Sequence, residues 1–190
     1  GISEGSTWRE RMTGSSLEFD GQNDYVNLGD SANEVMPYGN SSRSITAQVK
    51  METCDDNIIH ILHYGENSRG QAWGIAANCG NNPTLMAHEW NYYGGAGNVP
   101  YKESNLAITM NSTGYKKHYI DGDYVGYENT LPSTDLERNP KIGARVSGGE
   151  NWNGIIGSVR VYNRTLSQVE IKSLEQIDSN RWTNNACKFE

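Results

Sequence analysis

Short apolar runs recur at near-regular intervals along the chain, and glycine, asparagine or aspartate separates most of them. Within several runs apolar and polar residues alternate, as in residues 44–52, where Ile45, Ala47 and Val49 share one face. Such alternation is typical of half-buried β-strands. The runs occupy residues 16–21, 24–29, 44–52, 57–65, 71–79, 84–90, 105–111, 115–128 and 139–145 and the first half of 154–174. This pattern predicts an all-β protein built as a two-sheet antiparallel β-sandwich or jelly roll.

Two places along the chain predict β-hairpins. Residues 57–65 and 71–79 flank the polar segment ENSRG, which favours a turn centred near Asn67. Further along, Asp121 and Gly122 stand between the segments KKHYI and DYVGY. Asp-Gly is a strong signal for a tight hairpin turn, because glycine readily adopts the positive φ that such a turn requires.

A short helix is predicted at the end of the stretch GIIGSVRVYNRTLSQVEIKSL, residues 154–174. The first half of this stretch carries β-branched residues that suit a strand. In the second half, Ser167 and Glu170 form an S-x-x-E capping box, in which each side chain binds the backbone N–H of the other residue. A helix of about three turns at most is not stable alone, so we expect it to pack on the edge of the sandwich.

The composition limits both the architecture and the partners. The chain has 190 residues with 21 glycines and only 35% hydrophobic residues, which fits one β-domain with many turns and a modest core. Its net charge of −7 disfavours nucleic acid and anionic membranes as partners, because phosphates would repel it. No apolar run approaches the roughly 20 residues of a membrane span, so we expect no membrane insertion.

One domain is predicted over residues 1–178, because no linker, repeat or low-complexity segment divides them. After about Ile177 the sequence DSNRWTNNACKFE becomes polar. We therefore expect residues 179–190 to form an irregular tail or a junction to a neighbouring domain. The chain begins Gly-Ile-Ser without a signal peptide, as expected of a mature protein or an excised domain.

The positions of the cysteines indicate one disulfide bond. Cys54 and Cys79 lie almost equally far from the centre of the first hairpin. In an antiparallel pair this symmetry places them opposite each other, which predicts a bond and an oxidising, extracellular or cell-surface location. Two buried free thiols are the alternative. Cys187, in the polar tail, has no partner in this pairing. Three alternatives stay open for it: a free thiol, an intermolecular disulfide, or a disulfide to a cysteine outside this sequence.

Three N-x-S/T sequons also fit an exported protein. They begin at Asn40, Asn111 and Asn163, and each falls in a predicted turn, where a glycan can attach. Some of these matches are expected by chance in a chain rich in asparagine and serine.

Three segments together resemble one known family. They read SLEFDGQNDYVNLG, KKHYIDGDYVGY and KIGARVSGGENWNGIIGSVRVYNRTLSQVEIKSL, and in this order they span most of residues 15–177. The combination resembles the laminin-G-like, concanavalin A-like lectin/glucanase jelly-roll domains. The resemblance implies a β-sandwich whose last strand turns into a short helix packed against it.

The resemblance also raises the question of a structural calcium ion. Asp20, Asp24 and the carbonyls of the turn between them offer part of an oxygen shell of the kind that calcium prefers. The alternative is that both carboxylates bind only their own turn backbone. Many relatives carry an acidic residue where this chain has Gly157 and then Ser158, and this departure weakens the calcium prediction.

Catalysis is not predicted. Glycoside hydrolysis needs two carboxylates across a cleft, and on such sandwiches both usually lie in one alternating strand. Here Glu89 has no second acid two or four positions away, and the adjacent Asp55 and Asp56 would point to opposite faces of a strand. The four histidines are scattered and form no H-E-x-x-H motif.

The densest signal for ligand binding is the segment HEWNYYGGAGN, residues 88–98. Exposed aromatic rings can stack on sugar rings while amides and carboxylates bind hydroxyl groups. The alternative is that Trp90 and one tyrosine fill the edge of the sandwich. We expect Trp73 and Trp152 to pack in the core. The predicted sugar-binding residues are His88, Glu89, Trp90, Asn91, Tyr92, Tyr93 and Asn98.

The sequence therefore predicts a noncatalytic extracellular recognition module that binds carbohydrate weakly and gains strength by repetition. A glycan or a cell-surface protein is the expected partner. The main alternative is a structural or adhesion domain that assembles with other proteins, or with itself, in a fibre, pilus or adhesin. A glycoside hydrolase is the least favoured possibility, because the sequence shows no pair of acids of the kind that such an enzyme needs. The fold alone does not decide among these functions.

Overall fold

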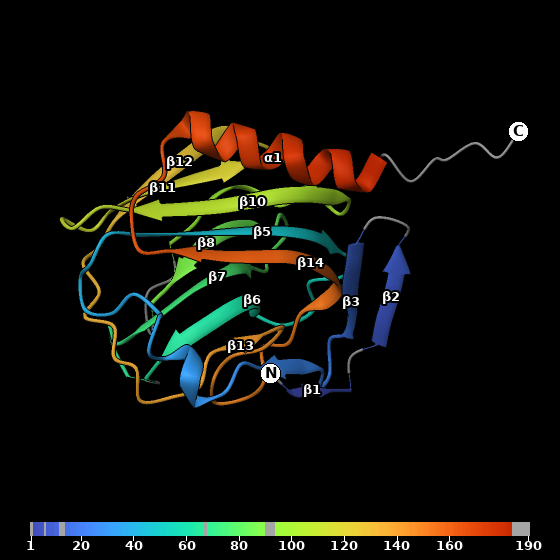
Figure 1. The fold of residues 1–190 in the computed structure, drawn as a ribbon, viewed down its shortest axis with the longest axis horizontal. Helices are drawn as coiled ribbons and strands as arrows, with labels where there is room; N and C mark the ends of the chain where they lie inside the picture. Colours follow the sequence, from blue (N-terminus) through green and yellow to red (C-terminus); the bar gives the residue numbers. More distant parts are fainter. Residues whose placement is uncertain (1, 6, 12–13, 67, 90–93, 184–190) are drawn as a thin grey trace, which may run out of the picture.

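Two antiparallel β-sheets lie face to face in the computed structural model, with one long helix against the second sheet (Figure 1). The structure describes residues 2–5, 7–11, 14–66, 68–89 and 94–183. Within these residues each sheet has seven strands. The predicted all-β sandwich with a C-terminal helix is confirmed.

We call the two sheets A and B and give their strands in spatial order. Sheet A consists of β1 (Ile2–Glu4), β4 (Tyr25–Asn27), β13 (Lys141–Ile142), β6 (Ile58–Gly65), β7 (Ala72–Asn78), β8 (Thr84–His88) and β9 (Ala96–Asn98). Sheet B consists of β12 (Asp123–Asn129), β11 (Tyr115–Ile120), β10 (Glu103–Met110), β5 (Arg43–Met51), β14 (Asn153–Tyr162), β3 (Gly14–Asp20) and β2 (Thr7–Arg11). A short 3₁₀ helix, η1 (Asp30–Ala32), follows β4, and α1 spans Gln168–Thr183.

The core lies between the sheets and follows the alternation along the strands. In β5, Ile45, Ala47 and Val49 are at most 2% exposed and belong to one apolar cluster with residues of sheet A. Trp73 and Trp152 are fully buried in this cluster, so the prediction that both pack in the core is confirmed. Burial of such large aromatic side chains compensates for the low fraction of hydrophobic residues.

The predicted hairpins and disulfide bond are present. β6 pairs with β7 from Ile58 opposite Asn78 onward, and this pairing brings Cys54 and Cys79 together in a disulfide with a Cα–Cα distance of 5.4 Å. Asp121 and Gly122 form the turn between β11 and β12, with φ values of 50° and 78°. Cys187 lies outside the described residues.

The C-terminal helix has the predicted cap but is longer than predicted. The Ser167 N–H donates to Glu170 Oε2 at 2.8 Å, and the Glu170 N–H donates to Ser167 Oγ at 3.3 Å. The helix continues to Thr183 rather than ending after three turns. Asp178 explains the extension, because its carboxylate accepts two hydrogen bonds from Arg160 of β14, at 2.7 and 2.8 Å. The polar residues that suggested a tail from residue 179 therefore begin within the helix.

A network of charged side chains is buried inside the sandwich at β11. Lys116 is fully buried, forms an ion pair with Glu89 after β8, and donates to the Thr130 carbonyl at 2.6 Å. His118 Nδ1 lies 3.0 Å from the Leu85 carbonyl, and its Nε2 lies 3.3 Å from Glu128 Oε1. Because a carbonyl only accepts, His118 carries its proton on Nδ1, and its Nε2 can accept a hydrogen bond from Glu128 when that carboxyl group is protonated.

Burial controls the ionisation of this network. Loss of solvation lowers the pKa of His118 to about 4 and raises the pKa of Glu128 to about 7. Burial also lowers the pKa of Lys116, but the neighbouring Glu89 carboxylate opposes this shift. Between about pH 4 and pH 7 both Glu128 and His118 are therefore mostly neutral, which leaves Glu89 as the carboxylate that balances the Lys116 charge.

Loss of the disulfide tests the first hairpin. The bond joins residues 25 positions apart, and closing a loop of this size in the unfolded chain stabilises a fold by about 2–4 kcal/mol. We expect the Cys54→Ser, Cys79→Ser double variant to lose about this much free energy of unfolding, measured by urea denaturation. Cys187→Ser serves as the control. Equal midpoints for the double variant and the wild type would contradict the prediction.

Substitution of Glu128 tests the buried network. Its raised pKa means that the folded state holds a proton which the unfolded state releases, so stability falls as pH rises from about 4.5 to about 7. Glu128→Gln cannot release that proton, and its amide can donate to His118 at every pH. Relative to this variant, we expect the wild type to lose up to about 3 kcal/mol between pH 5 and pH 8 in urea unfolding.

The control for this experiment is Glu34→Gln, which changes an exposed carboxylate. Its stability should follow the wild-type pH profile. A constant difference between Glu128→Gln and the wild type across this pH range would mean that Glu128 is already ionised at pH 5.

Candidate functional site

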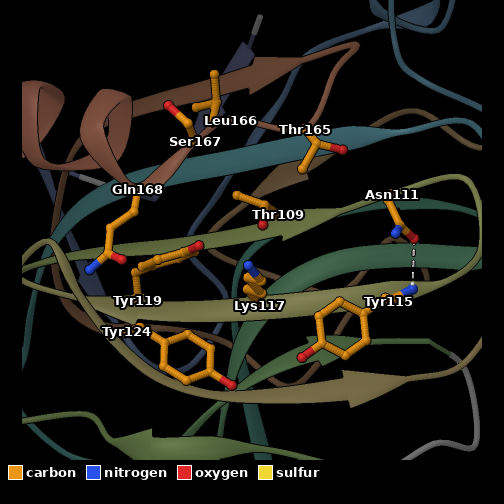
Figure 2. Close-up of a pocket in the computed structure, with 10 residues that line it drawn as sticks. All are labelled: Thr109, Asn111, Tyr115, Lys117, Tyr119, Tyr124, Thr165, Leu166, Ser167 and Gln168. Carbon is orange, nitrogen blue, oxygen red and sulfur yellow. Dashed lines mark hydrogen bonds between the residues drawn. The ribbon is translucent and has the colours of Figure 1, made fainter.

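A groove of about 630 Å³ opens on the outer face of sheet B, beside the beginning of α1. This volume is within the usual range for small-ligand sites, about 300–1,000 Å³. Figure 2 shows the side chains around it, which come from β10 and the turn after it, β11, β12, the turn before α1 and the first residue of α1. The residues that line this tyrosine groove are Thr109, Asn111, Tyr115, Lys117, Tyr119, Tyr124, Thr165, Leu166, Ser167 and Gln168.

The side chains of β11 that point away from the core form the floor of the groove. Lys116 and His118 point into the sandwich, where each is fully buried. Because successive side chains of a strand point to opposite faces, Tyr115, Lys117 and Tyr119 point outward. Tyr119 packs with Leu166 in a small apolar cluster on this outer face, separate from the main core.

Hydrogen bonds hold the turn before α1 against sheet B and so form the other wall. Ser44 Oγ of β5 donates to the Arg164 carbonyl at 2.8 Å and accepts from the Leu166 N–H at 2.9 Å. Thr165 Oγ1 donates to the Met110 carbonyl at 2.7 Å. These bonds tie the turn to the two central strands β5 and β10, which makes this wall a preformed part of the site.

Tyrosine rings dominate the groove and its rim. The Tyr119 and Tyr124 rings lie 6.1 Å apart, nearly edge to face, and the Tyr115 ring lies 5.2 Å from that of Tyr127. Tyr124 is 44% exposed and Tyr127 is 59% exposed, so their rings are open to a ligand. In Figure 2 the Tyr115 and Tyr124 hydroxyls point toward each other below Lys117. Partial burial raises the pKa of Tyr119 above its ordinary value, so its hydroxyl stays protonated at neutral pH.

Polar groups surround these rings. Lys117 is exposed and is the one charged side chain among the ten lining residues. Asn111 Oδ1 accepts hydrogen bonds from the Thr113 and Tyr115 N–H groups, each at 3.0 Å, which fixes the turn at one end of the groove. Gln168 is exposed at the opposite end, on the first turn of α1. The groove therefore offers aromatic faces together with hydroxyl, amide and ammonium groups.

The predicted sugar-binding segment 88–98 is only partly described. His88 is 3% exposed at the end of β8, and Glu89 is 4% exposed and paired with Lys116 inside the sandwich. This burial argues against a surface contact with sugar by either side chain. Asn98 is exposed at the end of β9, where it pairs with Thr84. Trp90, Asn91, Tyr92 and Tyr93 lie outside the described residues, and their role stays a prediction.

The predicted calcium ligands make the hydrogen bonds of a tight turn. Asp24 Oδ2 accepts from the Asp20 N–H at 2.9 Å, and Asp20 Oδ1 accepts from the Gln22 N–H at 2.8 Å. These bonds use one oxygen of each carboxylate, as in the alternative interpretation of the sequence. Calcium takes six to eight oxygen ligands, and among the described residues no third acidic side chain lies beside these two to form a ligand cluster. Asp20 and Asp24 stay a prediction as calcium ligands.

The sequons lie in turns, as predicted. Asn40 and Asn163 are exposed, whereas Asn111 is half-buried at the rim of the tyrosine groove. Whether any of them carries a glycan stays a prediction.

Sequence reasoning missed the tyrosine groove, although one signal for it was visible. Tyr115, Tyr119, Tyr124 and Tyr127 lie within 13 residues around the Asp-Gly turn. A hairpin with this turn brings all four rings to one sheet, and a count of aromatic residues on its two strands would have found them.

Together, the two facing antiparallel sheets and the capped C-terminal helix define a β-sandwich of the jelly-roll kind. A family profile described as the concanavalin A-like lectin/glucanases superfamily (Laminin_G_3) matches residues 20–172. The chain belongs to this superfamily. The superfamily includes both lectins and glucanases, so membership alone does not decide between binding and catalysis. No curated protein matches the sequence significantly.

Solved structures confirm the fold. One similar structure is domain 4 of AbnA, an extracellular GH43 arabinanase from Geobacillus stearothermophilus, solved in complex with arabinotriose. Its sequence is 19% identical to this chain and its TM-score is 0.70; the alignment covers 91% of this chain and 82% of that one. The SAP-like pentraxin of Limulus polyphemus is 10% identical with a TM-score of 0.68 and coverages of 88% and 84%. The binding domain of botulinum neurotoxin serotype G is 13% identical with a TM-score of 0.66 and coverages of 94% and 46%.

One further property bears on location. In the part of the chain that the structure describes, no helix has the length and apolarity needed to cross a membrane. The Cys54–Cys79 disulfide is compatible with an extracellular domain.

Proposed function

We propose that this domain is a noncatalytic extracellular module that binds carbohydrate in the tyrosine groove. The observation that carries the proposal is the set of tyrosine rings around an open groove of about 630 Å³. The hydrophobic face of a sugar ring packs on an aromatic ring, while its hydroxyl groups need nearby donors and acceptors. Tyr124 supplies an exposed ring, and Lys117 and Gln168 supply polar groups beside it.

The chemistry of the groove favours binding over hydrolysis. Glycoside hydrolysis uses a pair of carboxylates on either side of the scissile bond, and none of the ten described residues that line the groove is acidic. Glu170 accepts from the lining residue Ser167 at 2.8 Å and is paired with Arg164. Glu89 and Glu128 are buried on the inner side of sheet B, beside Lys116 and His118. They are separated from a ligand in the groove by the sheet itself.

The similar structures support a carbohydrate ligand without naming it. One of them was solved in complex with arabinotriose, and likeness at this level of identity extends to the fold alone. Lys117 would add an ionic contact to a sugar that carries a carboxylate or sulfate group. The ligand panel should therefore include neutral and acidic oligosaccharides.

The test is binding of the purified domain to such a panel, with calcium and again with a chelator. Protein made without N-glycosylation is required, because a glycan on Asn111 would stand at the rim of the groove. We expect saturable binding that Tyr124→Ala weakens about 5-fold, in line with the roughly 1 kcal/mol of one aromatic contact. Tyr101→Ala, which removes another exposed tyrosine, should bind like the wild type.

A Trp90→Ala variant distinguishes sugar binding in the groove from sugar binding at the predicted segment 88–98. Loss of binding in Trp90→Ala with full binding in Tyr124→Ala would move the sugar site to that segment. No binding to any glycan, with the protein folded and monodisperse, would overturn the proposal and favour an assembly domain. Weaker binding in the chelator would support the calcium prediction for Asp20 and Asp24.

A further inference from the structure

Three of the four histidines meet on the outer face of sheet A, far from the tyrosine groove on sheet B. His60 and His63 belong to β6 and His88 ends β8. Their ring centroids lie 4.6 to 5.1 Å apart. All three are at most 3% exposed. We call these residues the histidine cluster.

The backbone of sheet A brings this cluster together in two ways. In a regular strand residues three apart point to opposite faces, but β6 has a bulge between His60 and Leu62, which turns His60 and His63 to the same face. Gly74 of β7 lies between His63 and His88 in the sheet register. Any side chain at Gly74 would collide, since a Cβ there would lie 2.5 Å from the Leu62 carbonyl oxygen.

The spacing of the nitrogen atoms fits a metal ion. His60 Nε2 lies 3.1 Å from His88 Nδ1, and one ring nitrogen from each of the three residues lies within 4.8 Å of the others. Tetrahedral zinc with Zn–N bonds of about 2.0–2.1 Å places its ligand nitrogens about 3.3 Å apart. The longest of the three separations would have to shorten by up to about 1.5 Å to reach this geometry.

The electrostatic surroundings keep the rings neutral, as metal ligands must be. Burial lowers the pKa of all three histidines, that of His88 to about 4, and repulsion among the rings and from Arg145 adds to the shift. Glu150 Oε2 lies 3.4 Å from His60 Nδ1, and its other oxygen accepts from Arg145 at 2.9 Å. The 3.4 Å separation forms no hydrogen bond here, but the nearby carboxylate favours the tautomer with the proton on His60 Nδ1, which leaves the Nε2 lone pair toward the cluster centre.

His63 provides an independent sign of a missing partner. Its ring is fully buried, yet its Nε2 has no hydrogen-bond partner among the described residues. Its Nδ1 accepts a bond from the Val146 N–H at 3.3 Å, which is long. A buried polar atom without a partner costs about 1–3 kcal/mol, and a metal ion at Nε2 would satisfy this atom in exchange for the long bond at Nδ1.

We propose that the histidine cluster binds one divalent transition-metal ion, with His60 Nε2, His63 Nε2 and His88 Nδ1 as its protein ligands. Imidazole nitrogens suit zinc, copper, nickel or cobalt, whereas calcium and magnesium prefer oxygen. All three rings stay neutral on binding: the His88 proton moves from Nδ1, where it bonds His60 Nε2, to Nε2, and the His63 proton moves from Nε2 to Nδ1, which breaks the long bond from Val146. A fourth position is left for water or an exogenous ligand.

The first test uses wild-type protein stripped of metal with a chelator. Titration with Zn²⁺ by calorimetry should give one ion per chain, and Co²⁺ should produce the visible absorption of a tetrahedral site. Long-range ¹H–¹⁵N spectra should show that Zn²⁺ shifts the ring nitrogens of His60, His63 and His88, together with the Val146 amide. Absence of stoichiometric binding, or binding without shifts in these rings, would overturn the proposal.

Variants then identify the ligands. We expect His63→Ala to weaken Zn²⁺ binding at least about 100-fold and Glu150→Gln to weaken it about 10-fold through its effect on His60. The fourth histidine, His118, lies inside the sandwich, so His118→Gln is the matched control and should bind like the wild type. Circular dichroism verifies folding of each variant. Full affinity in folded His63→Ala, or an equal loss in folded His118→Gln, would contradict the assignment.

Discussion

The ion pair between Lys116 and Glu89 inside the sandwich is the constraint on which the candidate binding face depends. A buried ammonium group requires a partner, because leaving one charge of a buried pair uncompensated costs about 3–5 kcal/mol. Lys116 lies on β11 of sheet B, whereas Glu89 follows β8 of sheet A, so the pair joins the two sheets. The Lys116 ammonium nitrogen lies 5.5 Å from the centroid of the Trp73 ring, and the Arg43 guanidinium carbon lies 5.4 Å from it. Once Lys116 faces inward, Tyr115 and Tyr119 must face outward.

The two outer faces of the sandwich consequently carry different chemistry. The face of sheet B is aromatic, with a preformed wall from the turn that Ser44 holds. The face of sheet A carries the neutral histidine cluster, close to Arg145 and Glu150 of the loop between β13 and β14. The proposals for carbohydrate and for metal rest on separate residues, and either can fail without the other.

Local sequence signals predicted the fold because each acts between near neighbours. The Asp121-Gly122 turn, the Ser167–Glu170 cap and the symmetry of Cys54 and Cys79 about a hairpin involve only the residues that carry them. Contacts between distant segments were not predictable in this way. The length of α1 depends on a pair between Asp178 and Arg160 of β14, which no local pattern reveals.

The same distinction applies to the candidate sites. In YKKHYI either set of alternating residues could face the core, since each contains polar and aromatic or apolar residues. The choice depends on Glu89, 27 residues away from Lys116. The sequence did not predict the histidine cluster, because residues three apart in a regular strand, such as His60 and His63, point to opposite faces. The bulge in β6 brings both side chains to the same face.

The most direct test of the carbohydrate proposal is the response of the tyrosine rings to a bound oligosaccharide. Aromatic ¹H–¹³C spectra, recorded while the best ligand from the panel is added, report which rings the sugar contacts. The account predicts saturable shifts of Tyr115, Tyr119 and Tyr124, with Tyr101 unchanged. Saturable binding that leaves these three rings unshifted would contradict it.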